Sequence, residues 1–244
     1  RQIHNNASIV KGLHTANALV NGCALCGQCE ELCPENFSMA ELCLAAREDM
    51  VQRDFMPPSA HEFALEDMEN ASGPECALTL PDVALPEGAC ASWLFFPGCQ
   101  LAASRGGQTA ALYAFLRAAL PYRDGEGGVS LLLSCCGIPA RWAGREALFK
   151  EHTAEIRKEW EVLGRPRIMA ACSSCLSALR LALPEARSVS VWEVLNGLPL
   201  PPEHVDGLAK DRAEAALPKV FSIHDPCTAR WDGAWLEAVR GLAR

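Results

Sequence analysis

The sequence predicts an α/β fold, in which a small helical module precedes a larger domain built on a mainly parallel sheet. Two observations lead to this prediction. The first 56 residues contain a tight run of cysteines and one clear helical pattern, whereas short apolar runs alternate with helical patterns from residue 91 onward. Such alternation is typical of a parallel sheet with helices on its faces. We therefore expect a cysteine-bearing module at 1–56, a linker at 57–90 and an α/β domain at 91–244.

The N-terminal module should contain one well-defined helix after its cysteines. Irregular or weakly helical chain is expected over residues 1–22, leading into the cysteine run. Ser38 and Glu41 form an S-x-x-E capping box, which satisfies amide donors at the start of a helix. The helix should run from about Met39 to Arg53, with a buried stripe made of Met39, Leu42, Ala46 and Met50. Prolines at 57 and 58 should end it, and the stretch 57–90, rich in Pro, Glu, Gly and Ser, is interpreted as the linker.

The larger domain is expected to alternate strands with helices. Apolar runs of strand type are found at 92–97, 129–134, 167–171 and 219–223. Helical patterns lie between them at about 106–119, 144–163 and 174–183, and a last helix is expected from Trp231 to Arg244. Connections between parallel strands of one sheet should be right-handed.

Composition narrows the class of protein. With 244 residues, 50% hydrophobic and 21% charged, the chain is an ordinary globular protein. A formal charge of −8 argues against nucleic acid and anionic membrane surfaces, and suits docking to a basic partner. No apolar run approaches the roughly 18 residues that cross a bilayer. Thirteen cysteines, an odd number in a long chain, argue against a secreted disulfide framework and favour metal binding in a cytoplasmic protein.

The first group of cysteines has the spacing of an iron–sulfur site. Cys23, Cys26, Cys29 and Cys33 form the run C-x2-C-x2-C-x3-C, which is followed by proline. Bacterial ferredoxins hold 4Fe-4S clusters with this run. The first three thiolates would bind one cluster, and the fourth usually binds a neighbouring cluster. A structural zinc site is the alternative, although zinc sites favour paired C-x-x-C hooks that lie well apart in sequence.

The second group of cysteines follows three of the expected strands. It comprises Cys99, Cys135, Cys136, Cys172 and Cys175, and 35 residues separate Cys99 from Cys135 and again Cys136 from Cys172. The carboxyl ends of parallel strands meet at one edge of a sheet, so these thiols should converge there. Crowded thiolates repel one another unless a cation or cluster neutralises them. A zinc site or a group of buried reduced thiols is the alternative.

The pattern C-x35-C-C-G-x34-C-x-x-C resembles the cysteine-rich CCG domain of heterodisulfide reductase subunits and their relatives. A ferredoxin-like 4Fe-4S module before it is similar to the D-subunit arrangement, which also occurs in glycolate oxidase iron–sulfur subunits. The resemblance extends from about Cys23 to the end of the chain. It implies that the five cysteines hold a non-cubane 4Fe-4S cluster.

The chain departs from this family in two places. Ferredoxin modules of the family usually contain two four-cysteine runs, and this chain has one. The family also tends to carry two CCG motifs, and His224-Asp225-Pro226-Cys227 is similar to the start of the second. This makes Cys227 a candidate ligand without its companions. We expect the sequence to be a fragment of a longer protein, truncated in both modules.

Other candidate residues have simpler explanations. Cys43 lies inside the expected helix, where packing as a small hydrophobe is favoured over service as a replacement fourth ligand. Cys76 and Cys90 of the linker are interpreted as bystanders. For His224, local capping or packing is favoured over proton transfer. No acid–base group for turnover of a substrate is visible, so the catalytic residues stay unknown.

The leading hypothesis is an iron–sulfur oxidoreductase subunit of a heterodisulfide-reductase-like or flavin-linked enzyme, in which electrons pass from 4Fe-4S clusters to the CCG cluster. Its expected partners are other redox subunits, a flavoprotein or a membrane cytochrome, and flavin would be present only in such a partner. Localisation would be cytoplasmic, with any membrane attachment through a partner. The alternatives are a non-catalytic electron-relay or assembly subunit of an anaerobic respiratory complex, and a zinc-stabilised interaction module.

Overall fold

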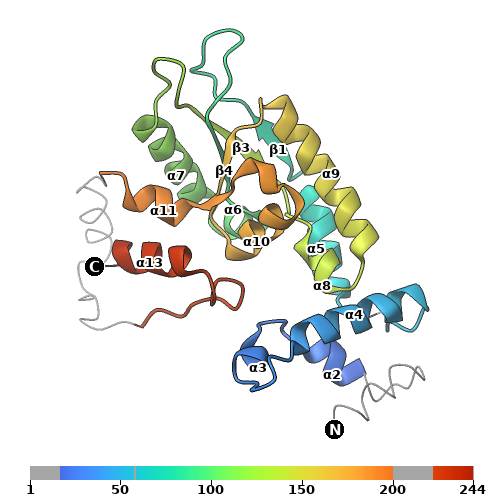
Figure 1. The fold of residues 1–244 in the computed structure, drawn as a ribbon. Helices are drawn as coiled ribbons and strands as arrows, with labels where there is room; N and C mark the ends of the chain where they lie inside the picture. Colours follow the sequence, from blue (N-terminus) through green and yellow to red (C-terminus); the bar gives the residue numbers. More distant parts are fainter. Residues whose placement is uncertain (1–16, 58, 200–221, 244) are drawn as a thin grey trace, which may run out of the picture.

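The computed structural model describes residues 17–57, 59–199 and 222–243 (Figure 1). Three helices near the N-terminus form a small module below a five-stranded sheet, which helices cover on both faces. The sheet is mostly parallel, so the predicted α/β class is confirmed.

The N-terminal module consists of α2 (Asn17–Gly22), α3 (Gln28–Glu31) and α4 (Met39–Gln52). Helix α4 begins as predicted, because the amide of Glu41 donates a hydrogen bond of 3.3 Å to Ser38 Oγ. Its buried stripe is rotated from the expected one: Met39 and Leu42 are only half-buried, and the buried residues are Cys43, Ala46, Arg47 and Met50. An arginine was not expected there, because arginine is seldom fully buried without a partner.

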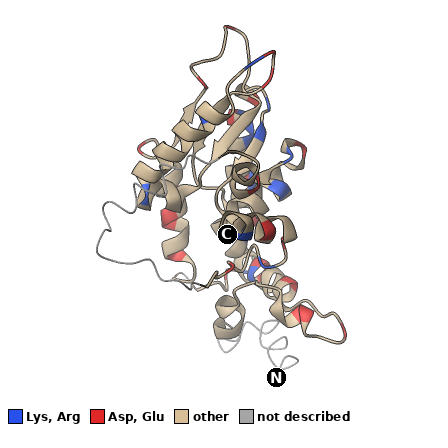
Figure 2. Ribbon diagram, turned by 90° about the vertical axis from the view of Figure 1, so that its left-hand side faces the viewer, with Lys and Arg blue, Asp and Glu red and all other residues tan. Residues whose placement is uncertain are grey.

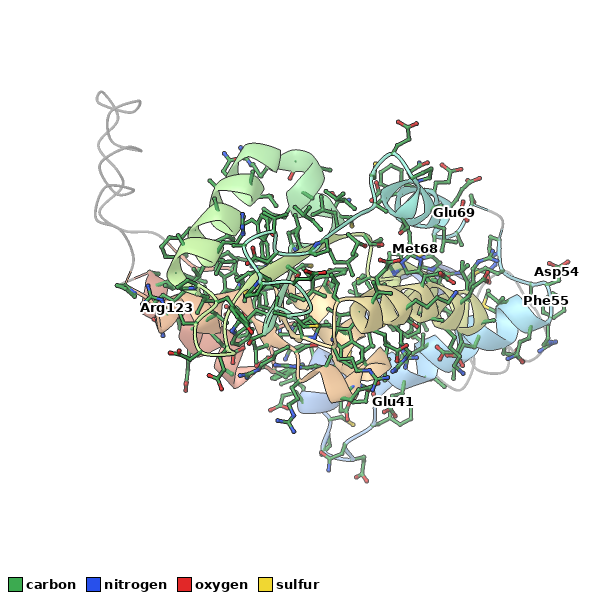
Figure 3. All side chains as sticks on the ribbon, turned by 90° about the horizontal axis from the view of Figure 1, so that it is seen from above. Glu41, Asp54, Phe55, Met68, Glu69 and Arg123 are labelled. Atoms are coloured by element: carbon green, nitrogen blue, oxygen red, sulfur yellow. The ribbon has the colours of Figure 1, made fainter. Side chains whose placement is uncertain are left out.

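Regular structure is present in the stretch 57–90, where only a linker was expected. It contains α5 (Glu62–Ser72) and β1 (Leu78–Leu80). Helix α5 buries Met68 at 2% exposure, while Glu69 beside it is exposed, and Figure 3 shows Met68 against the packed interior. Strand β1 pairs antiparallel with the edge of the sheet. These elements pack on the α/β domain, and the division of the chain into domains stays a prediction.

The sheet has the order β1-β3-β2-β4-β5. Strands β2 (Trp93–Phe96), β3 (Val129–Leu133) and β4 (Arg167–Ala170) lie close to three of the predicted positions, and the short β5 (Val189–Ser190) completes the sheet. Strand β2 is parallel to β3 on one side and to β4 on the other, and β5 is parallel to β4. The carboxyl ends of these strands therefore lie at one edge of the sheet. Of the expected strand 219–223, residues 219–221 lie outside the described residues, and Ser222 and Ile223 are irregular.

Apolar side chains of each central strand enter two cores. In β2, Leu94 and Phe96 belong to one core and Phe95 to the other, and all three are fully buried. The first core contains residues of α5, α9 (Glu146–Val162) and α10 (Ser173–Ala182). The second contains residues of α7 (Gly106–Ala119) and α11 (Val191–Asn196). Burial on both faces explains why the strands are continuous apolar runs in the sequence.

Four further elements complete the domain. Two short helices, α6 (Cys99–Ser104) and α8 (Ile138–Trp142), follow β2 and β3 directly. A 3₁₀ turn spans Pro184–Ala186. Helix α13 (Gly233–Leu242) forms within the range expected for the last helix, and its Trp235 packs edge-on against Trp192 of α11, with ring centroids 6.4 Å apart.

Candidate metal centre

The second group of cysteines lies at the carboxyl edge of the sheet. Cys99 follows β2, the pair Cys135-Cys136 follows β3, and Cys172 follows β4, with Cys175 in the first turn of α10. Strand β2 lies between β3 and β4, so the three cysteine-bearing loops are neighbours. We call these five residues the rim cysteines. Their ligand roles stay a prediction, but the structure brings the side chains together.

Hydrogen bonds between thiols join the rim cysteines into one cluster. Contacts link Cys99 to Cys135, Cys135 to Cys136, Cys136 to Cys175 and Cys175 to Cys172. Cys135, Cys136 and Cys175 are 1%, 3% and 3% exposed, whereas Cys99 and Cys172 are half-buried. The cluster therefore has a buried interior and two members that reach the surface.

The thiols of the rim cysteines differ in pKa. Hydrogen bonds from Cys135 and Cys175 lower the pKa of Cys136 to about 5, although burial opposes this shift. A hydrogen bond from Cys175 lowers the pKa of Cys172 to about 6. The pKa of Cys175 is raised well above its usual value, since its thiol hydrogen bonds to Cys136 and Cys172. The hydrogen bonds thus favour thiolates at Cys136 and Cys172 and the protonated form at Cys175.

Backbone amides also donate to the rim sulfurs. Cys99 accepts from the amide of Gln100, and Cys136 from that of Ile138, at the start of α8. Cys172 occupies the N-cap position of α10, where the amides of Cys175 and Ser174 help to lower the pKa of its thiol. Free amides at a helix start stabilise negative charge, so this edge of the sheet favours anionic sulfur.

Gly98 allows the close approach of two rim loops. Its φ of +82° suits glycine, and a Cβ at this position would lie 2.9 Å from Cys175 Sγ and 3.4 Å from Cys172 Cβ. The donor set, thiolates supported by backbone amides, fits an iron–sulfur cluster. Within the described ranges, no three or more His, Cys, Asp or Glu side chains are arranged to hold a single metal ion.

The first group of cysteines lies on the loop between α2 and α3, within α3 and just after it. Cys23 and Cys26 are half-buried, Cys29 is exposed, and Cys33 follows α3 with a half-buried side chain. Gly27 has a φ of +73° at the start of α3, which turns the loop. None of these four thiols is fully buried, and their ligand roles stay a prediction.

Cys43 joins this group from α4. It is 2% exposed, as expected for core packing, but its thiol also hydrogen bonds to Cys23. Burial raises the pKa of Cys43 to about 11, and the charge of Cys23 and their hydrogen bond add to the effect. Cys76 and Cys90 are exposed, in keeping with their interpretation as bystanders.

The segment 224–232 contacts both cysteine regions. Thr228 Oγ1 lies 2.6 Å from Ser173 Oγ, next to the rim, and Trp231 Nε1 donates a hydrogen bond of 3.0 Å to the carbonyl of Cys26. Cys227 is exposed. Asp225 forms an ion pair with Arg240 at 2.7 Å, which lowers the pKa of Asp225 and supports a structural role for the residues around His224.

Two residues that contact the first cysteine loop, Arg47 and Trp231, were not predicted from the sequence. Arg47 could have been suspected, because it lies one helical turn after Cys43 and on the same face of α4. Trp231 carried no signal, since its contact with Cys26 joins residues more than 200 positions apart.

Comparison with known proteins finds one family match. Residues 93–180 match the family model of the CCG cysteine-rich domain. This range contains all five rim cysteines, and such domains are found in iron–sulfur redox subunits. Searches of the curated proteins and of the solved structures find no match. In the part of the chain that the structure describes, no helix combines the length and apolar character needed to span a membrane.

Proposed function

We propose that this chain is an iron–sulfur electron-transfer subunit of a heterodisulfide-reductase-like or flavin-linked oxidoreductase. One observation carries the proposal. Five rim thiols from three neighbouring strand ends form one cluster, within residues that match the CCG domain. Thiolates in this number are costly to gather unless a cluster neutralises them.

The residues of the chain bind and tune the clusters. Cys23, Cys26 and Cys29 would hold a 4Fe-4S cluster with a fourth ligand from elsewhere, and Cys33 would serve a neighbouring cluster. The rim cysteines would hold the CCG cluster, of non-cubane type, with Cys227 as a further candidate. Bound clusters supply one-electron redox chemistry, while the protein excludes water and donates amide hydrogen bonds to sulfur. Burial of Cys135, Cys136 and Cys175 supports this role.

Partners would supply the remaining chemistry. A flavoprotein or membrane cytochrome would exchange electrons with the chain, and flavin would be bound only there. We propose a cytoplasmic location, with any membrane attachment through a partner. The net charge of −8 suits a basic docking face. Figure 2 shows acidic residues near the N-terminal end of the molecule and, together with basic ones, on the loops at the opposite end.

Reductive titration followed by paramagnetic resonance tests the proposal. Anaerobically purified protein should show signals of reduced iron–sulfur clusters, and Cys135→Ser should remove those of the CCG centre while leaving the N-terminal ones. Cys76→Ser is the matched control, since Cys76 is exposed and lies outside both groups. Protein that binds zinc and stays silent on reduction would instead support the zinc-stabilised module.

A relay without catalysis is the second candidate, and the burial of the rim favours it. Three of the five rim cysteines are at most 3% exposed, which hinders direct contact with a disulfide substrate. Disulfide reduction by the isolated, cluster-loaded chain would exclude this candidate. Electron transfer to a partner without such activity would support it.

A further inference from the structure

Arg47 is a buried arginine in the middle of α4, 2% exposed. Its guanidinium donates to three carbonyl oxygens, two beside the first cysteine loop and one on α8. Nε and Nη2 lie 3.0 and 2.8 Å from the carbonyl oxygen of Val20, and Nη2 lies 2.5 Å from that of Cys23. Nη1 lies 2.6 Å from the carbonyl oxygen of Trp142. Lysine lacks the planar fork that reaches several acceptors in this way.

Among the described residues, all four hydrogen bonds of Arg47 go to carbonyl oxygens and none to a carboxylate. A buried charge without a counter-charge is costly. Burial lowers the pKa of Arg47, and the nearby sulfurs of Cys23 and Cys43 oppose that shift. The groups that contact the buried guanidinium thus belong to the first cysteine loop, to α2 before it and to Trp142.

The same side chain joins the two cysteine sites. Trp142 is the last residue of α8, and at the other end of α8 the amide of Ile138 donates to Cys136 Sγ. The loop after α8 lies directly on the backbone of α4, since a Cβ on Gly144 would be 2.5 Å from the carbonyl carbon of Arg47. Arg47 thus holds the first cysteine loop against the element that follows Cys135-Cys136.

We propose that Arg47 is a positioning residue that sets the reduction potential of the N-terminal iron–sulfur centre. This inference rests on the proposed function. Net charge and hydrogen bonds set the potentials of such clusters, and a buried positive charge favours the form with one more electron. In the test reaction, reduced methyl viologen loses one electron and the centre gains it. Arg47 stays protonated throughout, and no bond or proton is exchanged.

The experiment is a potentiometric titration, followed by paramagnetic resonance, of the full-length protein and three variants. Arg47→Met removes the charge at similar volume, and Arg47→Lys keeps the charge without the fork. Arg53→Gln is the matched control, because Arg53 caps the C-terminal end of the same helix but pairs with Asp49 at the surface. We expect Arg47→Met to lower the equilibrium constant for reduction of the N-terminal centre about tenfold, a shift of about 59 mV to more negative potential. Arg47→Lys should shift it less, and Arg53→Gln not at all.

Each outcome decides the proposal. An unchanged potential in an Arg47→Met protein that holds its N-terminal centre would overturn it, as would an equal shift in Arg53→Gln. If Arg47→Met loses the N-terminal centre, the Arg47→Lys variant decides between two outcomes. A retained centre with a nearly normal reduction potential in Arg47→Lys supports the role of the charge. Loss of the centre in Arg47→Lys as well means that Arg47 is only structural. A wild-type protein without an N-terminal centre would overturn the proposed function together with this inference.

Discussion

Gly98→Ala offers the sharpest test of whether the rim cysteines depend on the close approach of their loops. The new methyl group would lie 2.9 Å from Cys175 Sγ, closer than carbon and sulfur atoms pack, at a φ of +82° that alanine rarely adopts. Backbone strain costs about 1–3 kcal/mol, and forced overpacking adds a similar amount. We therefore expect a loss of about 2–6 kcal/mol in the free energy of unfolding of the apoprotein.

Gly88 provides the matched control. It also has a positive φ, +78°, but a Cβ there meets nothing within 4 Å. Gly88→Ala should therefore show only the backbone cost, about 1–2 kcal/mol. Denaturant unfolding measures the stability of both variants, and iron analysis after anaerobic reconstitution measures their capacity to hold clusters.

The two variants should also differ in iron content. Gly98→Ala should lose the iron of the CCG centre, because Cys175 must move away from Gly98, while Gly88→Ala should keep it. If Gly98→Ala matches Gly88→Ala in both stability and iron, the close approach of the rim loops has no functional importance and the reasoning is wrong.

Three further predictions concern the scaffold. Asp82 accepts hydrogen bonds from the amides of Val129 and Ala84 and from Arg117 at 2.7 Å, which outweigh burial and lower its pKa. The contribution of ionised Asp82 to the free energy of unfolding should thus be complete at neutral pH and disappear as pH falls through the depressed pKa. The free energies of unfolding of wild type and Asp82→Asn should therefore converge only in acid. Ser38→Ala should cost about 1 kcal/mol, measured by denaturant unfolding, through loss of the α4 cap. Trp231→Phe should cost about 1 kcal/mol by losing the bond to Cys26, and equal stability would contradict that contact.

The order of the α/β elements could be predicted because local signals were strong. Continuous apolar runs marked β2, β3 and β4, and the capping residue Ser38 marked the start of α4. Once the strands were taken as parallel, their carboxyl ends had to share an edge, which placed the rim cysteines together. Physical chemistry of the sheet, rather than any single motif, made that prediction possible.

Other features depend on tertiary contacts that leave little local trace. Strand β1 is three residues long and forms because it can pair with the free edge of β3. Asp82 then holds the following turn by accepting hydrogen bonds from the Val129 amide and from Arg117. Strand β5 has two residues, too few for a hydrophobic pattern. Helix α5 has a left-handed residue, His61, at its start in place of a capping side chain, so its beginning carries no signal.

The first cysteine site was predicted from spacing alone, but its surroundings were not. Contacts of Cys43 and Arg47 with Cys23 arise because α4 folds back over the loop. A helical pattern predicts which face of the helix is buried, but not which carbonyl oxygens a buried arginine will contact. The rotated stripe of α4 follows from that arginine, since burying Arg47 leaves Met39 and Leu42 only half-buried.

Native mass spectrometry under anaerobic conditions tests the central claim most directly, because it measures the mass of the iron, sulfide or zinc bound to the protein. The protein should carry mass increments of iron with inorganic sulfide, and Cys136→Ser should lose the increment of the CCG centre. A wild-type protein that binds only zinc would contradict an iron–sulfur cluster held by the rim cysteines. A Cys136→Ser variant that keeps all of the iron and sulfide of the wild type would contradict it as well.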